Sequence, residues 1–259
     1  VLNSLEQNDM MENSVLVVFS DNGACPADGG SNWPNKGGKF DVYEGGVRVP
    51  AIVFSMLLPD DVRGTKFDGL FHVTDWMPTL LGLSGFNESV VTRFNGINQW
   101  PALKGAPDAA FRDEILLQCN SMEIDAGLTV SRMAFPFAHG ALIYEDMKYV
   151  LNAGTTADWY PPTEAGIKNC SCGMQDGVLF GLYNLTNDPN ERENLAFALP
   201  DVADYLRERL HGWYRREADP IWKPPEEMAL NVWEETGHIT PWHRPGAKGG
   251  TADESDAAI

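Results

Sequence analysis

Short apolar runs predict strands in the first part of the chain. Residues 15–19 and 49–55 are dominated by β-branched and other apolar side chains, and we expect residues 15–19 to form a buried strand of a parallel or mixed sheet. Residues 23–46 are rich in Gly, Pro, Asn and Asp and show no periodicity, which is typical of a long functional loop. Asp75 is a candidate N-cap, and residues 76–83 after it predict a helix.

A different pattern begins after residue 110. Strand-forming residues cover 114–119, 140–144, 148–151 and 181–184, and the second and third of these runs are spaced as a hairpin. Residues 201–216 place apolar side chains on one stripe, as in a helix that covers a sheet. Antiparallel strands closed by one helix predict an α+β unit.

These patterns predict three regions. Residues 1–110 form an α/β unit, and residues 111–222 form a smaller unit with an antiparallel sheet and a helix. Residues 223–259 form an irregular, partly disordered tail, in which Pro, Gly and charged residues dominate. No apolar run approaches the roughly 18 residues that a membrane-spanning helix needs, so we expect no membrane span.

The overall charge narrows the range of partners. The formal net charge is −18, from 37 acidic and 19 basic residues. Such a chain has no electrostatic reason to bind nucleic acid or an anionic membrane. It can still bind an anion locally if a few cations are focused in one cleft. Hydrophobic residues make up 43% of the chain, enough for a packed core, which excludes a disordered chain.

The cysteines and glycosylation sequons bear on the cellular compartment. Four cysteines are too few for a disulfide scaffold, and we expect one bridge, from Cys119 to Cys170 or Cys172, if the protein is secreted. Three Asn-x-Ser/Thr sequons are consistent with a secretory route. The candidate glycosylation sites are Asn87, Asn169 and Asn184.

The sequence places a candidate metal site at the end of the first strand. Asp21 and Asn22 follow residues 15–19 directly, and ligands of open α/β sheets bind beyond the carboxyl ends of strands. A carboxylate and an amide oxygen are hard donors suited to Ca²⁺ or Mg²⁺. The alternative is that Asp-Asn-Gly is a turn whose side chains only cap the backbone.

Cationic residues follow in the long loop. Lys36 and Lys39 lie in Asn-Lys-Gly-Gly-Lys, where a lysine is a compact charge able to hold phosphate or sulfate, and glycines let the backbone approach a ligand. The alternative is that both are solvated loop lysines. Residues 44–48, Glu-Gly-Gly-Val-Arg, suggest a tight backbone passage with positive φ. Arg48 can pair with Glu44 or Asp41, or face an anion.

The order of these segments is more specific than any one of them. A strand with Ser-Asp-Asn-Gly, a Gly-rich loop with Asn-Trp-Pro, Gly-Gly-Lys-Phe-Asp-Val-Tyr-Glu-Gly-Gly-Val-Arg-Val-Pro and His-Val-Thr-Asp-Trp-Met-Pro-Thr-Leu follow one another. The arrangement resembles the type I sulfatases of the alkaline phosphatase superfamily, most closely the arylsulfatase B-like branch. The resemblance is strong over residues 14–83 and looser through residues 183–195.

The resemblance implies roles for individual residues. Asp21 and Asn22 match two ligands of one divalent cation, usually Ca²⁺. Lys39 matches the lysine that binds the sulfate, and Trp33 matches a position at the pocket rim. The nucleophile of the family is a formylglycine made from the Cys of Cys-x-Pro-Ser-Arg. No such motif occurs in this sequence, and we expect the formylglycine upstream, in a missing N-terminal half of the same protein.

The resemblance also implies the fold and the function. We expect residues 1–110 to be the C-terminal part of a sulfatase catalytic α/β domain, and the chain to be an inactive portion of a secreted or lysosomal enzyme that hydrolyses a sulfated small molecule or glycan. One alternative is another alkaline-phosphatase-superfamily hydrolase acting on phosphoesters or phosphonates. Another is a sulfatase-like binding module without catalysis.

Overall fold

The structure is a computed structural model that describes residues 1–86, 95–120, 139–153, 158–161, 178–216 and 227–238. The chain divides into two compact units, Val1–Glu217 and Ala218–Ile259. The predicted division at residue 110 falls inside the first unit and stays a prediction. None of the helices in the described ranges is long and apolar enough to cross a membrane.

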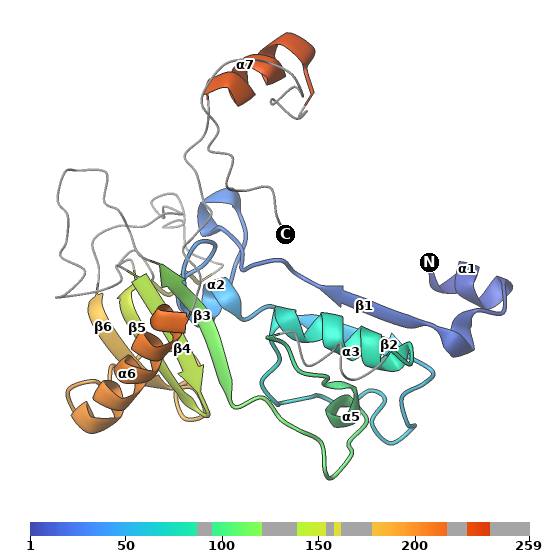
Figure 1. The fold of residues 1–259 in the computed structure, drawn as a ribbon, viewed down its shortest axis with the longest axis horizontal. Coiled ribbons are helices and arrows are strands. Elements are labelled where there is room, and N and C mark those ends of the chain that lie inside the picture. Colours follow the sequence, from blue (N-terminus) through green and yellow to red (C-terminus); the bar gives the residue numbers. More distant parts are fainter. Residues whose placement is uncertain (87–94, 121–138, 154–157, 162–177, 217–226, 239–259) are drawn as a thin grey trace. The chain divides into compact units, whose positions relative to one another are not determined.

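The first two strands form a small sheet by themselves. Strand β1 (Val15–Phe19) pairs antiparallel with β2 (Ala51–Ser55), and helix α3 (Trp76–Leu83) lies beside them (Figure 1). The rings of Phe19 and Trp76 stack with their centroids 5.6 Å apart. Both strands and the helix were predicted, and the structure confirms them.

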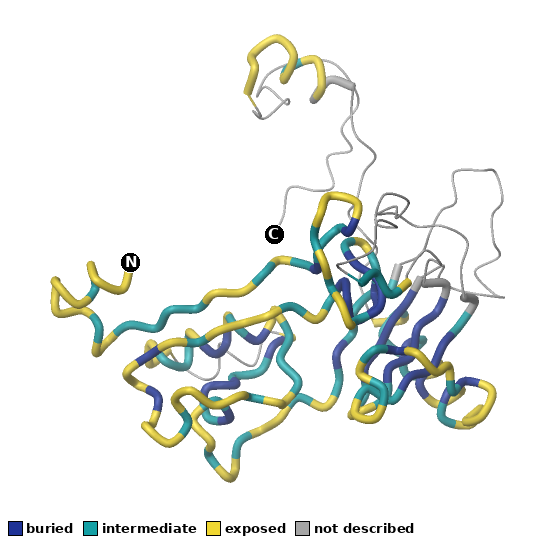
Figure 2. Tube along the Cα trace, turned by 180° about the vertical axis from the view of Figure 1, so that it is seen from behind, coloured by how far each residue is buried: buried dark blue, intermediate teal, exposed yellow. Residues whose placement is uncertain are grey.

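The predicted surroundings of β1 were wrong. Within the described ranges this sheet has two strands, both antiparallel, and Val18 and Ile52 are 55% and 64% exposed. Figure 2 shows most of β1 and β2 as exposed or intermediate. A continuous apolar run is typical of a strand covered on both faces, but one partner strand and one short helix do not present enough surface to cover it.

The second sheet contains the main core of the first unit. Its order is β3-β4-β5-β6, all antiparallel, and helix α6 (Pro200–Arg216) packs against it. The predicted strands, the hairpin and the helix are confirmed. The strand bounds are Glu114–Asn120 for β3, His139–Tyr144 for β4, Met147–Ala153 for β5 and Val178–Asn184 for β6.

Both faces of this sheet are covered. Leu142, Leu151 and Leu182 pack with α6 on one face. Their neighbours in sequence point to the other face, because side chains alternate along a strand, and there Val150 and Tyr183 pack with Tyr43 from the long loop. Segments from before and after residue 110 therefore share one core.

Short helical segments precede, connect or follow these elements. They are α1 (Leu2–Gln7), η1 (Met11–Asn13), η2 (Pro26–Asp28), α2 (Glu44–Val47), η3 (Val73–Asp75) and α5 (Trp100–Leu103). In the second unit, α7 (Glu227–Thr236) differs from the irregular tail that we expected. Its sequence is free of Pro and Gly, so nothing in it opposes a helix. The predicted disorder of residues 249–259 lies outside the described residues.

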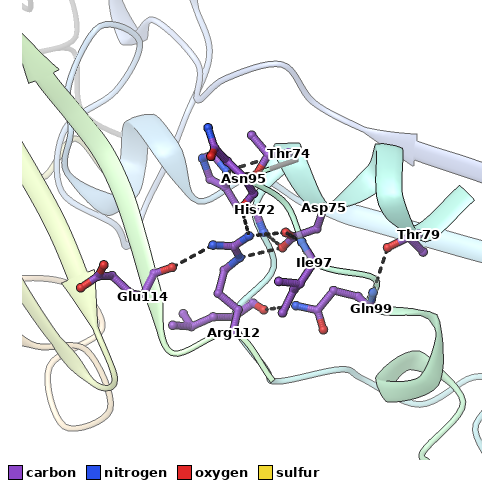
Figure 3. A network of polar contacts seen from close by, with 10 residues as sticks. His72, Thr74, Asp75, Thr79, Asn95, Ile97, Gln99, Arg112 and Glu114 are labelled. Atoms are coloured by element: carbon purple, nitrogen blue, oxygen red, sulfur yellow. Dashed lines mark hydrogen bonds and ion pairs between the residues drawn. The ribbon is translucent and has the colours of Figure 1, made fainter. Parts of the chain in front are cut away.

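Asp75 does more than begin helix α3. Its side chain makes no capping bond to that helix. Instead, its buried carboxylate accepts hydrogen bonds from the backbone N–H groups of His72 and Ile97, both at 2.9 Å, and from the Arg112 guanidinium through Nε and Nη2 (Figure 3). Arg112 also donates to the backbone oxygen of Glu114. This network joins the start of α3 to the start of β3.

Candidate functional site

A shallow cavity of about 380 Å³ lies where β1 leaves the small sheet. It brings together Asp21, Asn22 and Lys39, the residues singled out by the sequence. Their chemical roles remain predictions. The cavity is lined by residues 20–25, Asp28, Gly30 and Lys39.

The long loop is folded back on itself by its own hydrogen bonds. The Asn32 side chain accepts from the Ala24 N–H at 2.7 Å and donates to the Ala24 carbonyl at 2.8 Å. The Lys39 N–H donates to the same carbonyl at 3.1 Å. At Gly38 a Cβ atom would lie 2.6 Å from that oxygen, so only glycine allows this approach. These contacts carry Lys39 back to the end of β1.

Asp21 and Asn22 have the hydrogen bonds of a turn. The Asp21 carboxylate accepts from the Asn22 N–H at 2.9 Å, and the Asn22 side chain donates to the Gly23 carbonyl at 3.0 Å. The Ser20 hydroxyl donates to the Asn22 carbonyl at 2.9 Å. Among the described residues, no hydrogen bond reaches the second oxygen of Asp21 or the amide oxygen of Asn22. Turn and ligand roles are therefore compatible.

Sequence reasoning missed Asp28 in the cavity wall. Its only signal was its place in the Gly-rich loop, shortly after Cys25. Two carboxylates, one amide and one ammonium group thus border the same space, and such a set can hold a cation beside an oxyanion.

The donor set fits only part of a calcium site. Ca²⁺ takes six to eight oxygens, and the described residues contain no group of three or more His, Cys, Asp or Glu side chains placed to hold a metal ion. Asp21 and Asn22 therefore have the right chemistry but cannot complete a coordination shell.

Lys36 is not part of the cavity wall. It is 8% exposed, and its ammonium group lies 4.2 Å from the ring centroid of Tyr43, 5.0 Å from that of Trp159 and 5.6 Å from that of Tyr183. Burial lowers its pKa, although nearby carboxylates oppose the shift. The suggested anion-binding role of Lys36 is therefore replaced by an anchoring role against the second sheet.

Residues 44–48 hold a buried ion cluster that the sequence did not reveal. The Lys148 ammonium lies 3.0 Å from Glu44 Oε1 and 2.8 Å from Glu191 Oε1, and all three side chains are buried. Glu191 also accepts from the Glu44 N–H at 2.7 Å. Burial raises the pKa of Glu191, against the opposing effect of Lys148. Arg48 pairs with Glu44 at 3.5 Å, one of the pairings considered for it.

The two glycines of this segment allow close packing rather than positive φ. Gly45 and Gly46 are helical, within α2, so the expected positive φ was wrong. A Cβ on Gly46 would lie 2.3 Å from the Asp41 carbonyl, and one on Gly45 would lie 2.4 Å from the Lys36 carbonyl. In the long loop, positive φ is found instead at Gly29 (90°), Gly37 (77°) and Phe40 (76°).

Trp33 is a surface residue of the same loop, 44% exposed. The guanidinium carbon of Arg192 lies 5.6 Å from its ring centroid and 5.1 Å from that of Trp159. No sequence pattern indicated this stack, because Arg192 is far from both rings along the chain.

Comparison with known proteins shows which family this chain resembles. The Sulfatase family model matches residues 1–86, the segment that contains the cavity. Over these residues the chain is similar to the sulfatases. The similarity to individual sulfatases extends further: arylsulfatase J of Mus musculus is 28% identical over 253 residues, covering 93% of this chain and 41% of that protein. The N-acetylgalactosamine-6-sulfatase of Homo sapiens is 32% identical over 108 residues, covering 40% of this chain and 20% of that protein.

Solved structures confirm the fold class. The structure of Ps i-CgsB in complex with k-i-k-neocarrahexaose matches with a TM-score of 0.61 at 20% identity, over 90% of this chain and 43% of that one. The PsFucS1 sulfatase from Pseudoalteromonas sp. matches with a TM-score of 0.55 at 23% identity, over 81% of this chain and 39% of that one. The predicted mixed α/β fold of the sulfatases is therefore correct, and the chain spans about two fifths of the lengths of such relatives.

Of the three candidate glycosylation sites, only Asn184 lies within the described residues. It ends β6, where its side chain donates to Asp146 Oδ2 at 2.7 Å and accepts from the N–H groups of Thr186 and Asn187. Its role as a glycan acceptor stays a prediction. Asn87 and Asn169 lie outside the described residues.

The expected bridge from Cys119 is not present. Cys119 is a thiol, whereas Cys25, in the cavity wall, is disulfide-bonded. Cys119 is the last residue but one of β3. The spacing of cysteines along the chain does not show which of them form a disulfide bond. Cys170 and Cys172 lie outside the described residues.

Proposed function

We propose that this chain supplies part of the active site of an enzyme that hydrolyses sulfate esters. In this proposal Lys39 binds the sulfate group, and Asp21 and Asn22 contribute oxygen ligands to one divalent cation, Ca²⁺. The observation that carries it is the single cavity bordered by all three side chains. The match of residues 1–86 to the sulfatase family model supports the same reaction class.

The charges in the cavity suit the two binding tasks. The Lys39 ammonium, together with a divalent cation held at Asp21 and Asn22, would offset the negative charge of the sulfate oxygens. Within the described ranges no carboxylate lies within ion-pair distance of Lys39, so its charge is available to a ligand. A formylglycine, expected upstream, would supply the nucleophile when present. In this proposal the residues of this chain bind and orient the sulfate group and neutralise its negative charge.

The wider setting follows from the same proposal. We propose a sulfated small molecule or glycan as the substrate, an N-terminal half of the same protein as the partner that completes the site, and a secretory or lysosomal compartment. The similar sulfatases act, by their names, on sulfated N-acetylgalactosamine or aryl sulfates.

Because the nucleophile is expected upstream, the purified chain alone should hydrolyse an aryl sulfate no faster than a buffer blank.

Replacing Lys39 with Met should weaken sulfate binding about tenfold, because one charge-assisted contact is lost. Isothermal titration with sodium sulfate in the presence of CaCl₂ would measure it. Lys66→Met is the matched control, since Lys66 is exposed and outside the cavity wall, and it should bind as the wild type does. Equal affinities for the wild type and Lys39→Met would contradict the proposed role of Lys39.

A further inference from the structure

The guanidinium of Arg192 is exposed and available. Among the residues that the structure describes, no carboxylate lies within ion-pair distance of it, although the chain carries a net charge of −18. It lies against the ring faces of Trp33 and Trp159, at 5.6 and 5.1 Å. A guanidinium stacked on a ring keeps its N–H edge free to donate. This edge can therefore bind an anion from solution.

The stack is held in place by groups behind it. The Trp159 indole N–H donates to the Asn190 carbonyl at 2.7 Å, and the buried Lys36 ammonium lies 5.0 Å from the same ring. Glu191, next to Arg192 in sequence, is fixed by its buried contact with Lys148. The position of the guanidinium is thus set before any ligand arrives, which reduces the entropy lost on binding.

The long loop connects the stack to the cavity. Trp33 follows Asn32, whose side chain makes two hydrogen bonds to the backbone of Ala24. Ala24 lines the cavity together with Lys39. Trp33 is therefore the next residue in the chain after Asn32, which is hydrogen-bonded to the cavity wall.

We propose that Arg192 and Trp33 form a second subsite, which binds an anionic group on the sugar residue next to the one whose sulfate lies at Lys39. The inference rests on the proposed function and adds the substrate class: an oligosaccharide with at least two anionic groups. The planar fork of arginine matches the paired oxygens of a carboxylate or a sulfate. The flat, amphipathic face of Trp33 suits a sugar ring.

Three probes separate this subsite from the site at Lys39. They are a chondroitin sulfate tetrasaccharide, its carboxyl-reduced form and the monosaccharide N-acetylgalactosamine 6-sulfate, each titrated into the chain with CaCl₂ present. Arg192→Gln should weaken tetrasaccharide binding about tenfold and leave monosaccharide binding within about twofold. Arg192→Lys keeps the positive charge without the planar fork of arginine, and it should weaken tetrasaccharide binding about threefold. Arg207→Gln, an exposed arginine of α6, should change neither.

The outcomes are distinguishable. If Arg192→Gln binds the tetrasaccharide as the wild type does, or if the wild type binds the tetrasaccharide no better than the monosaccharide, the subsite is refuted. If Lys39→Met leaves monosaccharide binding intact while Arg192→Gln weakens the tetrasaccharide, the proposed function fails and the subsite stands. Weaker binding of the carboxyl-reduced tetrasaccharide assigns the anion at Arg192 as a carboxylate, and unchanged binding assigns it as a sulfate.

Discussion

Replacing Lys148 with Met is expected to lower the free energy of unfolding by about 3–5 kcal/mol, the cost of breaking a buried ion cluster from one side. Lys148 is fully buried, and its ammonium neutralises Glu44 and Glu191 at 3.0 and 2.8 Å. Methionine fills a similar space with an apolar chain, so the loss reports on charge rather than on a cavity. Urea unfolding monitored by circular dichroism would measure it.

The stability lost in Lys148→Met should depend on pH. Burial already raises the pKa of Glu191 in the wild type, although Lys148 opposes the shift, and removal of the ammonium removes that opposition. A carboxyl group whose folded pKa is raised contributes stability below its ordinary pKa of about 4.3, and loses it as pH rises through the folded value. Lys148→Met should therefore be less destabilised, relative to wild type, at pH 5 than at pH 8.

Two further variants test the explanation. Adding Glu191→Gln to Lys148→Met removes one of the stranded buried charges, and should restore part of the lost stability. Arg207→Met breaks an exposed pair with Asp204, at 3.0 Å, and should cost less than about 1 kcal/mol. A loss from Lys148→Met no larger than that from Arg207→Met would show that the buried cluster does not stabilise the fold.

Lys148 also illustrates where sequence patterns stop being informative. The hairpin of β4 and β5 was predictable, because two apolar runs are separated by Glu145 and Asp146, and Glu145 adopts the positive φ of 54° that such a turn needs. The polar residue at position 148 then suggests a solvent-facing strand position. It is buried because the long loop covers that face, and Glu44, its partner, lies 104 residues away in the sequence.

The same limit applies to β1 and to the candidate site. The run Val15–Phe19 predicts a strand correctly, but apolarity alone does not say what covers it. Asp21 and Lys39 were found from the order of motifs along the chain. Asp28 and Arg192 were missed, since their places depend on how the loop closes and on which segments of the second sheet meet it.

Asp75→Asn is the second substitution expected to have a large effect. It should lower the free energy of unfolding by about 3–5 kcal/mol. Both Asp75 oxygens accept from two donors each, and the side chain is fully buried. An asparagine presents an NH₂ group to one pair of these donors and removes the charge that pairs with Arg112. The network joins α3 to β3 (Figure 3), so the loss should appear in global unfolding.

The pH dependence of this loss identifies its cause. Burial alone would raise the pKa of Asp75, but hydrogen bonds from Arg112 and from the N–H groups of His72 and Ile97 outweigh it, and the pKa lies below its ordinary value. A carboxylate with a depressed folded pKa contributes stability above its ordinary pKa of about 3.9, and loses it as pH falls from there through the folded value. The difference in free energy of unfolding between the wild type and Asp75→Asn should therefore be constant from pH 5 to 7 and shrink as pH falls below about 4.

Asp60→Asn is the control, because Asp60 forms an exposed pair with Arg63 at 2.7 Å. Its free energy of unfolding should differ from that of the wild type by less than about 1 kcal/mol at every pH. A gap for Asp75→Asn that stays the same down to pH 3 would mean that the ionised carboxylate is not the source of the stability.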